Sequence, residues 1–275
     1  MKKIVVFGAC GKMGQRIIKT ISEKEEIETV SAIEAPDSPK IGKNVGDIIG
    51  IENVDVEVRG ADEIEKEFSE KDLNMMIDFT IADAAVENVK KSAKEGVSAI
   101  VGTTGFSDEQ EKEMEKAIEQ AGTSAVIAPN MSLGVNTFFK IVEKVAKILE
   151  DYDMELIESH HNQKVDAPSG TAMTAAEIAA EASDKDFEKV AKFGRDKGEH
   201  GERTDDEIGI HSVRAGNIAG DHKFLFAGPN ERLELTHKAQ SRQAFVQGVI
   251  EAIDFLADRA EAGKVFDMQD VLFKE

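Results

Sequence analysis

Two adjacent histidines and a nearby lysine form a group of side chains that could transfer protons. His160 and His161 are followed, three residues after the second histidine, by Lys164. Histidine exchanges protons near neutral pH, and lysine adds a positive charge or a second proton donor. A single residue of either kind is usually structural or solvated, but the combination with the turn that follows favours a catalytic site for proton transfer.

That turn is predicted to bind an anion. A helix is expected over 171–182, and Asp166, Pro168 and Ser169 before it are residues that commonly begin helices. Backbone N–H groups at a helix start would be free to bind a carboxylate, so the substrate is expected to be a small acid. The residues expected to hold the substrate carboxylate are His161, Ser169, Gly170 and Thr171.

A glycine-rich turn near the N-terminus predicts a dinucleotide site. It lies between an expected strand, 3–7, and an expected helix, 15–22, with glycines at positions 8, 11 and 14. Glycines at such a turn let the backbone approach a pyrophosphate at the helix start. The residues expected around the phosphates are Gly8, Ala9, Cys10, Gly11, Lys12 and Met13.

Glu34 is expected to bind the adenosine ribose. It comes directly after the second expected strand, 27–33, and lies 20 residues after Gly14. A carboxylate there accepts hydrogen bonds from ribose hydroxyls, but it repels a 2′-phosphate unless a cation is adjacent. The sequence therefore predicts NADH as the preferred cofactor, with Lys40 or Lys43 as the residues that could permit NADPH.

Strands and helices alternate over positions 1–130, which predicts a Rossmann-like doubly wound parallel sheet in an α/β fold. The expected strands are 3–7, 27–33, 54–58, 74–79, 97–101 and 124–128, and the expected helices are 15–22, 62–69, 82–95 and 108–121, the last capped by Ser107.

The pattern then changes to clustered strands, which predicts a second α+β domain on a mixed, mostly antiparallel sheet. Its expected helices are 137–149 and 171–182, its strands are 153–160, 208–214, 222–226 and 232–237, and 183–206 is expected to be a mobile loop. A helix over 241–262 should return to the first domain. The expected domains are 1–130 plus 240–275, for dinucleotide binding, and 131–239, for substrate binding and oligomerisation.

Residues 160–172, His-His-x-x-Lys-x-Asp-Ala-Pro-Ser-Gly-Thr-Ala, resemble the signature of the dihydrodipicolinate reductase (4-hydroxy-tetrahydrodipicolinate reductase) family. The resemblance continues in Asp-Phe-Thr at 78–80, Gly-Thr-Thr-Gly at 102–105, the Ala-Pro-Asn segment at 128–136, and the strands at 208–216 and 231–239. It implies further cofactor contacts at Phe79, Gly102, Thr103, Thr104, Ala128, Pro129, Asn130 and Met131.

The resemblance also implies an activity. It is the NAD(P)H-dependent reduction of 4-hydroxy-tetrahydrodipicolinate to tetrahydrodipicolinate, with loss of water, in lysine biosynthesis by the diaminopimelate pathway. His160 is then assigned as the proton donor, and Lys164 as a second donor or a stabiliser of developing charge. A homotetramer is expected, because in the family the second sheet pairs between subunits.

Composition limits the partners and the cellular location that are expected for the protein. The 275 residues carry a net charge of -20, which disfavours nucleic acid and anionic membranes as partners. Cys10 is the single cysteine and no apolar run approaches a membrane span, so a cytoplasmic location is expected. The acidity could be an adaptation to high internal salt. No third ligand lies at a suitable spacing from the histidines, and no metal site is expected.

Two alternative functions would share part of this pattern. Another two-domain Rossmann dehydrogenase acting on a small acidic substrate would explain positions 1–130 equally well, but not the segment from His160 to Thr171. A nucleotide-sensing module would use the glycine turn, but it would not need two histidines and a lysine beside an anion site.

Overall fold

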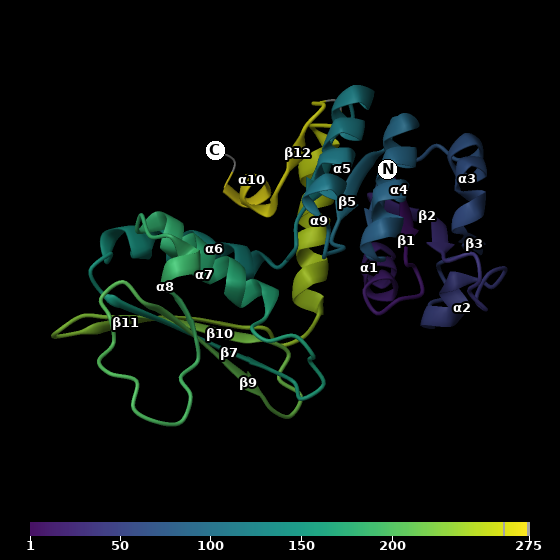
Figure 1. The fold of residues 1–275 in the computed structure, drawn as a ribbon. Helices are drawn as coiled ribbons and strands as arrows, with labels where there is room; N and C mark the ends of the chain where they lie inside the picture. Colours follow the sequence, from purple (N-terminus) through teal and green to yellow (C-terminus); the bar gives the residue numbers. More distant parts are fainter. Residues whose placement is uncertain (261, 274–275) are drawn as a thin grey trace. The chain divides into compact units, whose positions relative to one another are not determined.

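The structure, a computed structural model, describes residues 1–260 and 262–273, which form two compact units. The first unit comprises Met1–Met131 and the described residues from Phe245 onward, and the second comprises Ser132–Ala244. No helix in these described ranges is long and apolar enough to cross a membrane. Figure 1 shows the order of the elements along the chain.

The described part of the first unit contains a seven-stranded sheet in the order β12-β6-β5-β4-β1-β2-β3, and all its pairings are parallel. Its strands are β1 (Lys2–Phe7), β2 (Ile27–Glu34), β3 (Val58–Gly60), β4 (Met75–Asp78), β5 (Ser98–Val101), β6 (Ala125–Ile127) and β12 (Val265–Phe266). The order of strands reverses between β1 and β4. Ligands of such folds bind at that reversal, beside the carboxyl ends of the strands.

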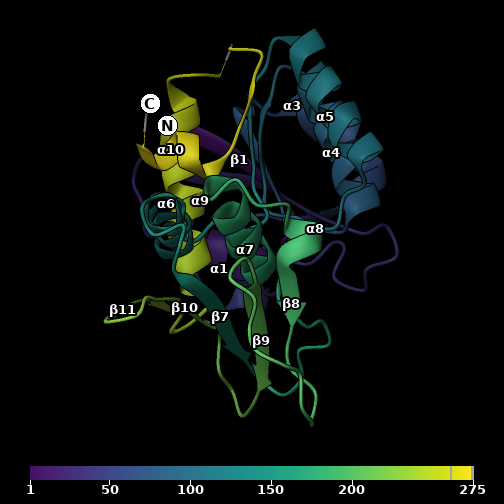
Figure 2. The same cartoon turned by 60° about the vertical axis from the view of Figure 1, so that its left-hand side comes forward.

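Helices cover both faces of this sheet, and for that reason β4 and β5 are buried along their whole length. The helices are α1 (Gly14–Ile21), α2 (Val45–Ile49), the 3₁₀ turn η1 (Ala61–Glu63), α3 (Ile64–Glu70), α4 (Ala82–Lys94), α5 (Asp108–Ala121), α9 (Gln243–Ala257) and α10 (Met268–Phe273). Figure 2 shows α3, α4 and α5 together on one side, with α1 and α9 on the other. The predicted Ser107 cap of α5 is confirmed as a reciprocal capping box with Gln110.

Two expected elements of this unit differ from the structure. The strand expected over 54–58 joins the sheet only from Val58 onward. The backbone groups of Val56 and Val58 instead bond to the loop before them, where the Val45 amide donates to the Val56 carbonyl at 2.7 Å and the Val58 amide donates to the Lys43 carbonyl at 2.9 Å. The helix expected over 241–262 ends at Ala257, and position 261 lies outside the described residues.

The described part of the second unit has a five-stranded mixed sheet in the order β11-β10-β7-β9-β8. Its strands are β7 (Asp153–His160), β8 (Ala191–Phe193), β9 (Ile208–Arg214), β10 (Asp221–Ala227) and β11 (Arg232–Lys238). The sheet is mixed as predicted, but β7 lies between the consecutive strands β9 and β10. β7 and β8 each pair with β9 in the parallel sense. β10 pairs with β7 and with β11 in the antiparallel sense, so antiparallel pairs are not the majority that the sequence predicts for this sheet.

Three helices accompany this sheet in the described residues: α6 (Leu133–Ile148), α7 (Gly170–Ala182) and α8 (Phe187–Val190). α6 begins before the expected start at 137 because the Ser132 side chain accepts a hydrogen bond from the Val135 amide. The segment 183–206, expected to be a loop, contains both α8 and the edge strand β8.

One face of this sheet changes character along its length. α6 and α7 lie on that face (Figure 2), where Met154 and Leu156 of β7 pack in an apolar cluster with Phe224 and Phe226 of β10. Side chains alternate along a strand, so the next buried positions of β7 on the same face are Glu158 and His160. The apolar core thus ends in a group of buried titratable side chains.

Candidate functional site

His160, the expected proton donor, is held by a buried carboxylate. Oε2 of Glu158 lies 2.6 Å from Nδ1 of His160, and Glu158 has no exposed surface. Arg214 of β9 is the register partner of His160, and its guanidinium donates to both oxygens of Glu158 at 2.8 Å. The Ser169 amide adds a bond of 3.2 Å to Oε1. Four N–H groups and the Ser212 side chain therefore share one carboxylate.

The charge of Glu158 follows from this setting. Burial by itself raises the pKa of the carboxyl group, but the hydrogen bonds from Arg214 and His160 outweigh burial and lower the pKa to about 2. Glu158 is therefore ionised throughout the neutral range. A buried carboxylate paired in this way is a strong acceptor for the proton on Nδ1 of the imidazole.

A second buried histidine adjoins the first. His222 of β10 is opposite Glu158 in the β7–β10 register, and its ring meets that of His160 edge-on with centroids 5.3 Å apart. Burial, followed by the charges of His160 and His237, lowers the pKa of His222 to about 4, so His222 is neutral at pH 7. Its Nε2 lies 3.1 Å from the hydroxyl oxygen of Ser169.

Ser169 caps α7 as predicted, but its own amide is not free. The Ser169 hydroxyl accepts a hydrogen bond of 3.2 Å from the Ala172 amide, which defines the helix start. The expectation that the Ser169 N–H would be free is wrong, because Glu158 already accepts from it. Gly170 and Thr171 remain the candidates for contact with a substrate carboxylate. Gly170 is exposed, and space is open where its side chain would be.

Lys164 and His161 lie in the loop between β7 and α7. Nζ of Lys164 donates to the Asp166 carboxylate at 2.8 Å, and that bond lowers the pKa of Asp166. The lysine is therefore paired with Asp166 and not with a histidine. Nδ1 of His161 is buried and has no hydrogen-bond partner in the described part of the chain.

The glycine turn has the geometry of a dinucleotide cradle. Gly8 follows β1 with φ +68°, and a side chain there would lie 2.9 Å from the Phe79 carbonyl oxygen. A Cβ on Gly14 would lie 2.2 Å from the Gly8 carbonyl oxygen. Both positions exclude side chains, which leaves the backbone beside the start of α1 open to a pyrophosphate. Gly11 and Lys12 are exposed, Met13 is half-buried, and Ala9 and Cys10 are buried.

Glu34 reaches this turn from the end of β2. Its Oε1 accepts a hydrogen bond of 2.6 Å from the Cys10 amide. Nζ of Lys40 donates to the Cys10 carbonyl at 3.2 Å, so a carboxylate and an ammonium group flank the same residue. Burial, and then the Glu34 charge, raises the pKa of the Cys10 thiol, which is therefore protonated at neutral pH.

The next two loops at this edge are joined by a buried carboxyl group that the sequence did not single out. The Thr103 hydroxyl donates to Asp78 Oδ1 at 2.7 Å, as does the Thr80 hydroxyl, and Asn88 donates to Oδ2 at 2.8 Å. Thr103 is expected to contact the cofactor, but its hydroxyl is bonded to Asp78 inside the protein. Thr104 is exposed.

The Phe79 ring and the last expected cofactor residues are also fixed by packing. A Cβ on Gly102 would lie 2.3 Å from the Phe79 ring, so the ring rests directly on the Gly102 backbone. Ala128 is buried, and its amide donates to the Val101 carbonyl at 3.1 Å. The buried Met131 carbonyl packs on Gly248 of α9, where a Cβ would lie 1.6 Å away. Between them Pro129 is exposed and Asn130 is partly exposed.

Sequence reasoning assigned no role to Glu158, Arg214, His222 or Asp78. The position of Glu158, two residues before His160 in an expected strand, was a usable signal, because both side chains must then share a face. Arg214 and His222 depend on strand order and register, which the sequence does not reveal. Within the described ranges, no group of three or more His, Cys, Asp or Glu residues could hold a metal ion.

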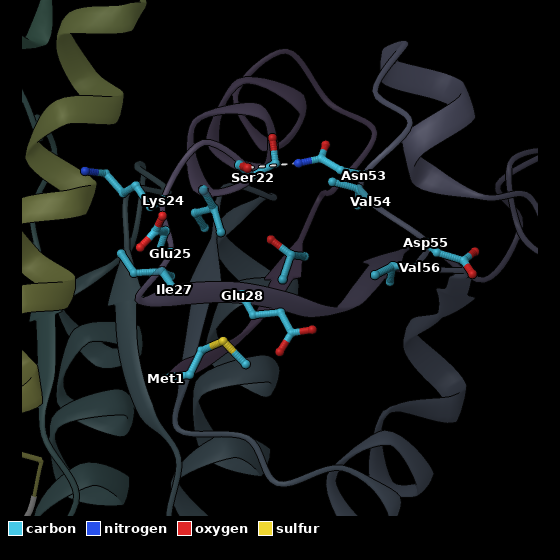
Figure 3. Close-up of a pocket in the computed structure, with 12 residues that line it drawn as sticks. Met1, Ser22, Lys24, Glu25, Ile27, Glu28, Asn53, Val54, Asp55 and Val56 are labelled. Atoms are coloured by element: carbon cyan, nitrogen blue, oxygen red, sulfur yellow. Dashed lines mark hydrogen bonds between the residues drawn. The ribbon is translucent and has the colours of Figure 1, made fainter.

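A separate cavity of about 380 Å³ lies at the end of the first sheet that is opposite to the glycine turn. Figure 3 shows Met1, Ile27 and Val54 around it, together with the hydrogen bond of 3.0 Å from Asn53 to the Ser22 carbonyl. Met1 and Ile27 stand at the amino ends of β1 and β2, whereas the glycine turn follows the carboxyl end of β1. This cavity is therefore not the dinucleotide site.

Two sequence profiles cover nearly the whole chain. The profile described as dihydrodipicolinate reductase, N-terminus, matches residues 2–131, and the one described as dihydrodipicolinate reductase, C-terminus, matches residues 134–272. The 4-hydroxy-tetrahydrodipicolinate reductase of Methanothermobacter thermautotrophicus is 50% identical over 272 residues and covers 99% of both chains. That of Methanocaldococcus jannaschii is 51% identical and covers 99% of this chain and 97% of the relative.

Solved structures have a similar fold. Dipicolinate-bound dihydrodipicolinate reductase from Paenisporosarcina sp. TG-14 superposes with a TM-score of 0.77 and 26% identity, over 98% of each chain. An amine dehydrogenase from Mycobacterium smegmatis, at 13% identity and a TM-score of 0.61 over 96% of this chain and 94% of that one, shares the fold alone. The chain belongs to the dihydrodipicolinate reductase family.

Proposed function

We propose that this protein reduces 4-hydroxy-tetrahydrodipicolinate to tetrahydrodipicolinate with NAD(P)H and loss of water, in lysine biosynthesis by the diaminopimelate pathway. The observation that carries this proposal is the Glu158–His160 contact of 2.6 Å beside the start of α7. This contact supports the proposal because a histidine that transfers a proton would then adjoin a helix start suited to a carboxylate. Relatives of this name match 99% of the chain, and one solved relative is described as bound to dipicolinate, a dicarboxylate.

Residues of the second unit bind the substrate and deliver a proton to it. Loss of water leaves a conjugated C=N–C=C system, whose carbon terminus gains a hydride while the ring gains a proton. His160 delivers this proton, and Lys164 acts as a second donor or stabilises the developing negative charge. Nδ1 of His161 and the first turn of α7, at Gly170 and Thr171, hold a substrate carboxylate.

The first unit holds the dinucleotide, and the crowding around Gly8 and Gly14 fits this role. A bound NAD(P)H would supply the hydride. Gly8 to Met13 would contact the pyrophosphate, Glu34 the adenosine ribose, and Phe79, Gly102, Thr104 and the loop from Ala128 to Met131 the nicotinamide end. Thr103 would contribute there through its backbone, because its hydroxyl is bound to Asp78.

NADH is the proposed preferred cofactor and NADPH the second. The Glu34 carboxylate lies at the turn that receives the ribose, where it would repel a 2′-phosphate. Lys40, bonded to the Cys10 carbonyl, stands close enough to this turn to offset part of the repulsion. The balance between these two charges would set the cofactor ratio.

The proposed assembly is a cytoplasmic homotetramer. The face of the second sheet opposite α6 and α7 carries Ile157, Val213 and Leu225, and Val213 is 43% exposed. Exposed apolar side chains among charged ones on such a face are suited to pairing with another subunit. Light scattering coupled to gel filtration would measure the mass of the assembly, and a monomer would contradict the proposal.

The function is tested by a coupled assay. A synthase generates the unstable substrate from pyruvate and aspartate semialdehyde, and absorbance follows oxidation of NADH and of NADPH in parallel. Wild-type turnover should fall about 100-fold or more in His160→Gln and Lys164→Ala, since general acid catalysis contributes that much. His211→Gln, on the opposite sheet face and bonded to Glu155, is the matched control and should retain turnover. Absence of turnover with either cofactor, in low and high salt, would favour another Rossmann dehydrogenase.

A further inference from the structure

We infer that Glu158 is a positioning residue, which fixes the protonated Nδ1 of His160 so that Nε2 is the nitrogen that delivers the proton. The inference rests on the proposed function, in which His160 is the proton donor. It adds a residue that does not touch the substrate but acts through His160, and it assigns Arg214 the task of holding Glu158 in place.

The contacts leave little freedom at Glu158. Oε2 faces His160 Nδ1 at 2.6 Å and accepts from Arg214 at 2.8 Å, whereas Oε1 accepts from Arg214 at 2.8 Å and from the Ser169 amide at 3.2 Å. The two-pronged contact with Arg214 fixes the plane of the carboxylate. An ionised carboxylate cannot donate, so the proton between Glu158 and His160 must reside on Nδ1.

The other nitrogen of the ring lies beside a glycine that carries no side chain to crowd it. A Cβ built on Gly220 would lie 3.0 Å from Nε2 of His160, and Gly220 has φ +154°. A side chain at this position would therefore crowd Nε2. Since Nδ1 is committed to Glu158, Nε2 is the nitrogen left for a substrate.

The proton transfer balances with Glu158 unchanged. The Nε2–H bond of the imidazolium breaks, a bond forms from that proton to the substrate ring, and the electron pair stays on Nε2. The product is neutral imidazole with its remaining proton on Nδ1, still donated to Glu158. The Glu158 carboxylate accepts the Nδ1 proton and so fixes the tautomer of the neutral ring.

Other charged groups around His160 set the background for any pH dependence. Arg214 approaches from β9 and the neutral His222 from β10, while Lys164 and Asp166 form an ion pair in the loop before α7. Glu158→Gln also removes the anionic partner of Arg214 and the charge that raises the pKa of His222. The comparison with Glu158→Asp, which keeps that charge, is therefore the part of the test that reports on the carboxylate beside His160.

The first test compares two substitutions on one strand. Glu158→Gln keeps the shape and removes the charge, and it should lower kcat at least about 10-fold while the KM for NADH stays unchanged. The pH profile of kcat should also change, because the charge of Glu158 is no longer present beside the imidazole. The matched control is Glu155→Gln, which breaks a comparable network with Arg195, Arg203 and His211 on the opposite sheet face. It should leave the pH profile in place.

Two further measurements separate positioning from simple support of the fold. In a His160→Gln background, Glu158→Gln should cost no additional turnover, whereas a purely structural role would add its loss. Glu158→Asp keeps the charge and should retain the wild-type pH profile, with a smaller loss of kcat. Equal losses from the Gln substitution with and without His160 would overturn the inference.

A readout independent of turnover distinguishes failure of this inference from failure of the proposed function. Nitrogen-15 NMR of histidine-labelled protein should show the neutral form of His160 with its proton on Nδ1, and Glu158→Gln should shift it toward Nε2. An unchanged tautomer in Glu158→Gln would refute the positioning role even if the reductase is active. A protein that shows the tautomer change but does not reduce the substrate would refute only the reaction.

Discussion

The amide of Cys10 donates a hydrogen bond of 2.6 Å to Oε1 of Glu34, which ties the end of β2 to the glycine turn after β1. Lys40 binds the carbonyl oxygen of Cys10 at 3.2 Å. Opposite charges therefore flank one backbone position at the turn proposed to receive the adenosine ribose. Because a 2′-phosphate would experience both charges, these two side chains are the natural places to change cofactor choice.

Replacing Glu34 with glutamine should shift the cofactor ratio toward NADPH. The amide retains an acceptor for the ribose but removes the charge that repels the 2′-phosphate. We expect kcat/KM with NADPH to rise about 10-fold relative to that with NADH, which corresponds to about 1.4 kcal/mol. Steady-state kinetics with both cofactors measure this ratio. A wild-type enzyme that is already more efficient with NADPH would contradict the assignment of Glu34.

Lysine substitutions provide the complementary test. Lys40→Ala should weaken NADPH use more than NADH use, since the 2′-phosphate loses its nearby cation. Lys43→Ala tests the other lysine named for this role, which is exposed and lies three residues further along the same loop. Equal effects of the two substitutions would indicate a general electrostatic contribution and no specific contact by Lys40.

Gly170→Ala should separate substrate binding from stability. Space is open where the new methyl group would lie, and alanine favours a helix, so the free energy of unfolding should stay the same or rise by up to about 1 kcal/mol. If the start of α7 holds the substrate carboxylate, the methyl group should raise the KM for the substrate about 10-fold. The KM for NADH serves as the internal control. An unchanged substrate KM would place the carboxylate elsewhere.

Thr103→Val should destabilise the first unit, because the buried Asp78 carboxyl group loses one of its donors. We expect a loss of about 1–3 kcal/mol in the free energy of unfolding, measured by chemical denaturation. Thr104→Val at the neighbouring exposed position should change stability by less than about 0.5 kcal/mol. Unaltered stability in Thr103→Val would mean that its hydroxyl is not required by Asp78.

Much of the fold follows from local patterns in the chain. Alternation of strands and helices over positions 1–130 predicts the parallel sheet, and the bounds of α5, β7 and β9 match the expected ranges. The predictions are wrong where contacts with other segments of the chain determine how a strand pairs. Val56 bonds to the preceding segment and not to the sheet, and β7 lies between β9 and β10 and pairs with β9 in the parallel sense.

The candidate site shows the same division. His160, Lys164 and Ser169 are recognisable from their types and spacing within one short segment. Arg214 lies far from His160 in the sequence, and only the β7–β9 register brings it to Glu158. Sequence spacing predicts a free Ser169 amide because it does not reveal that a buried carboxylate accepts from that group.

The stability of the second unit should fall as the pH drops below about 6.5, and His222 is a principal cause. Burial lowers its folded pKa to about 4 from the ordinary value of 6.5. Between these values the unfolded chain binds a proton that the folded chain refuses, so the contribution is complete above pH 6.5 and is lost by pH 4. The shift corresponds to on the order of 3 kcal/mol. Urea denaturation at intervals from pH 7 to pH 4 measures it.

His222→Gln isolates this contribution. The variant should be less stable at pH 7, because Ser169 loses the bond to the imidazole, but its stability should fall less steeply between pH 6.5 and pH 4. A residual slope is expected from His237, whose pKa burial also lowers. His200→Gln, at an exposed position, should keep the full wild-type slope. If His222→Gln retained that slope, the proton uptake that destabilises the fold would belong to another group.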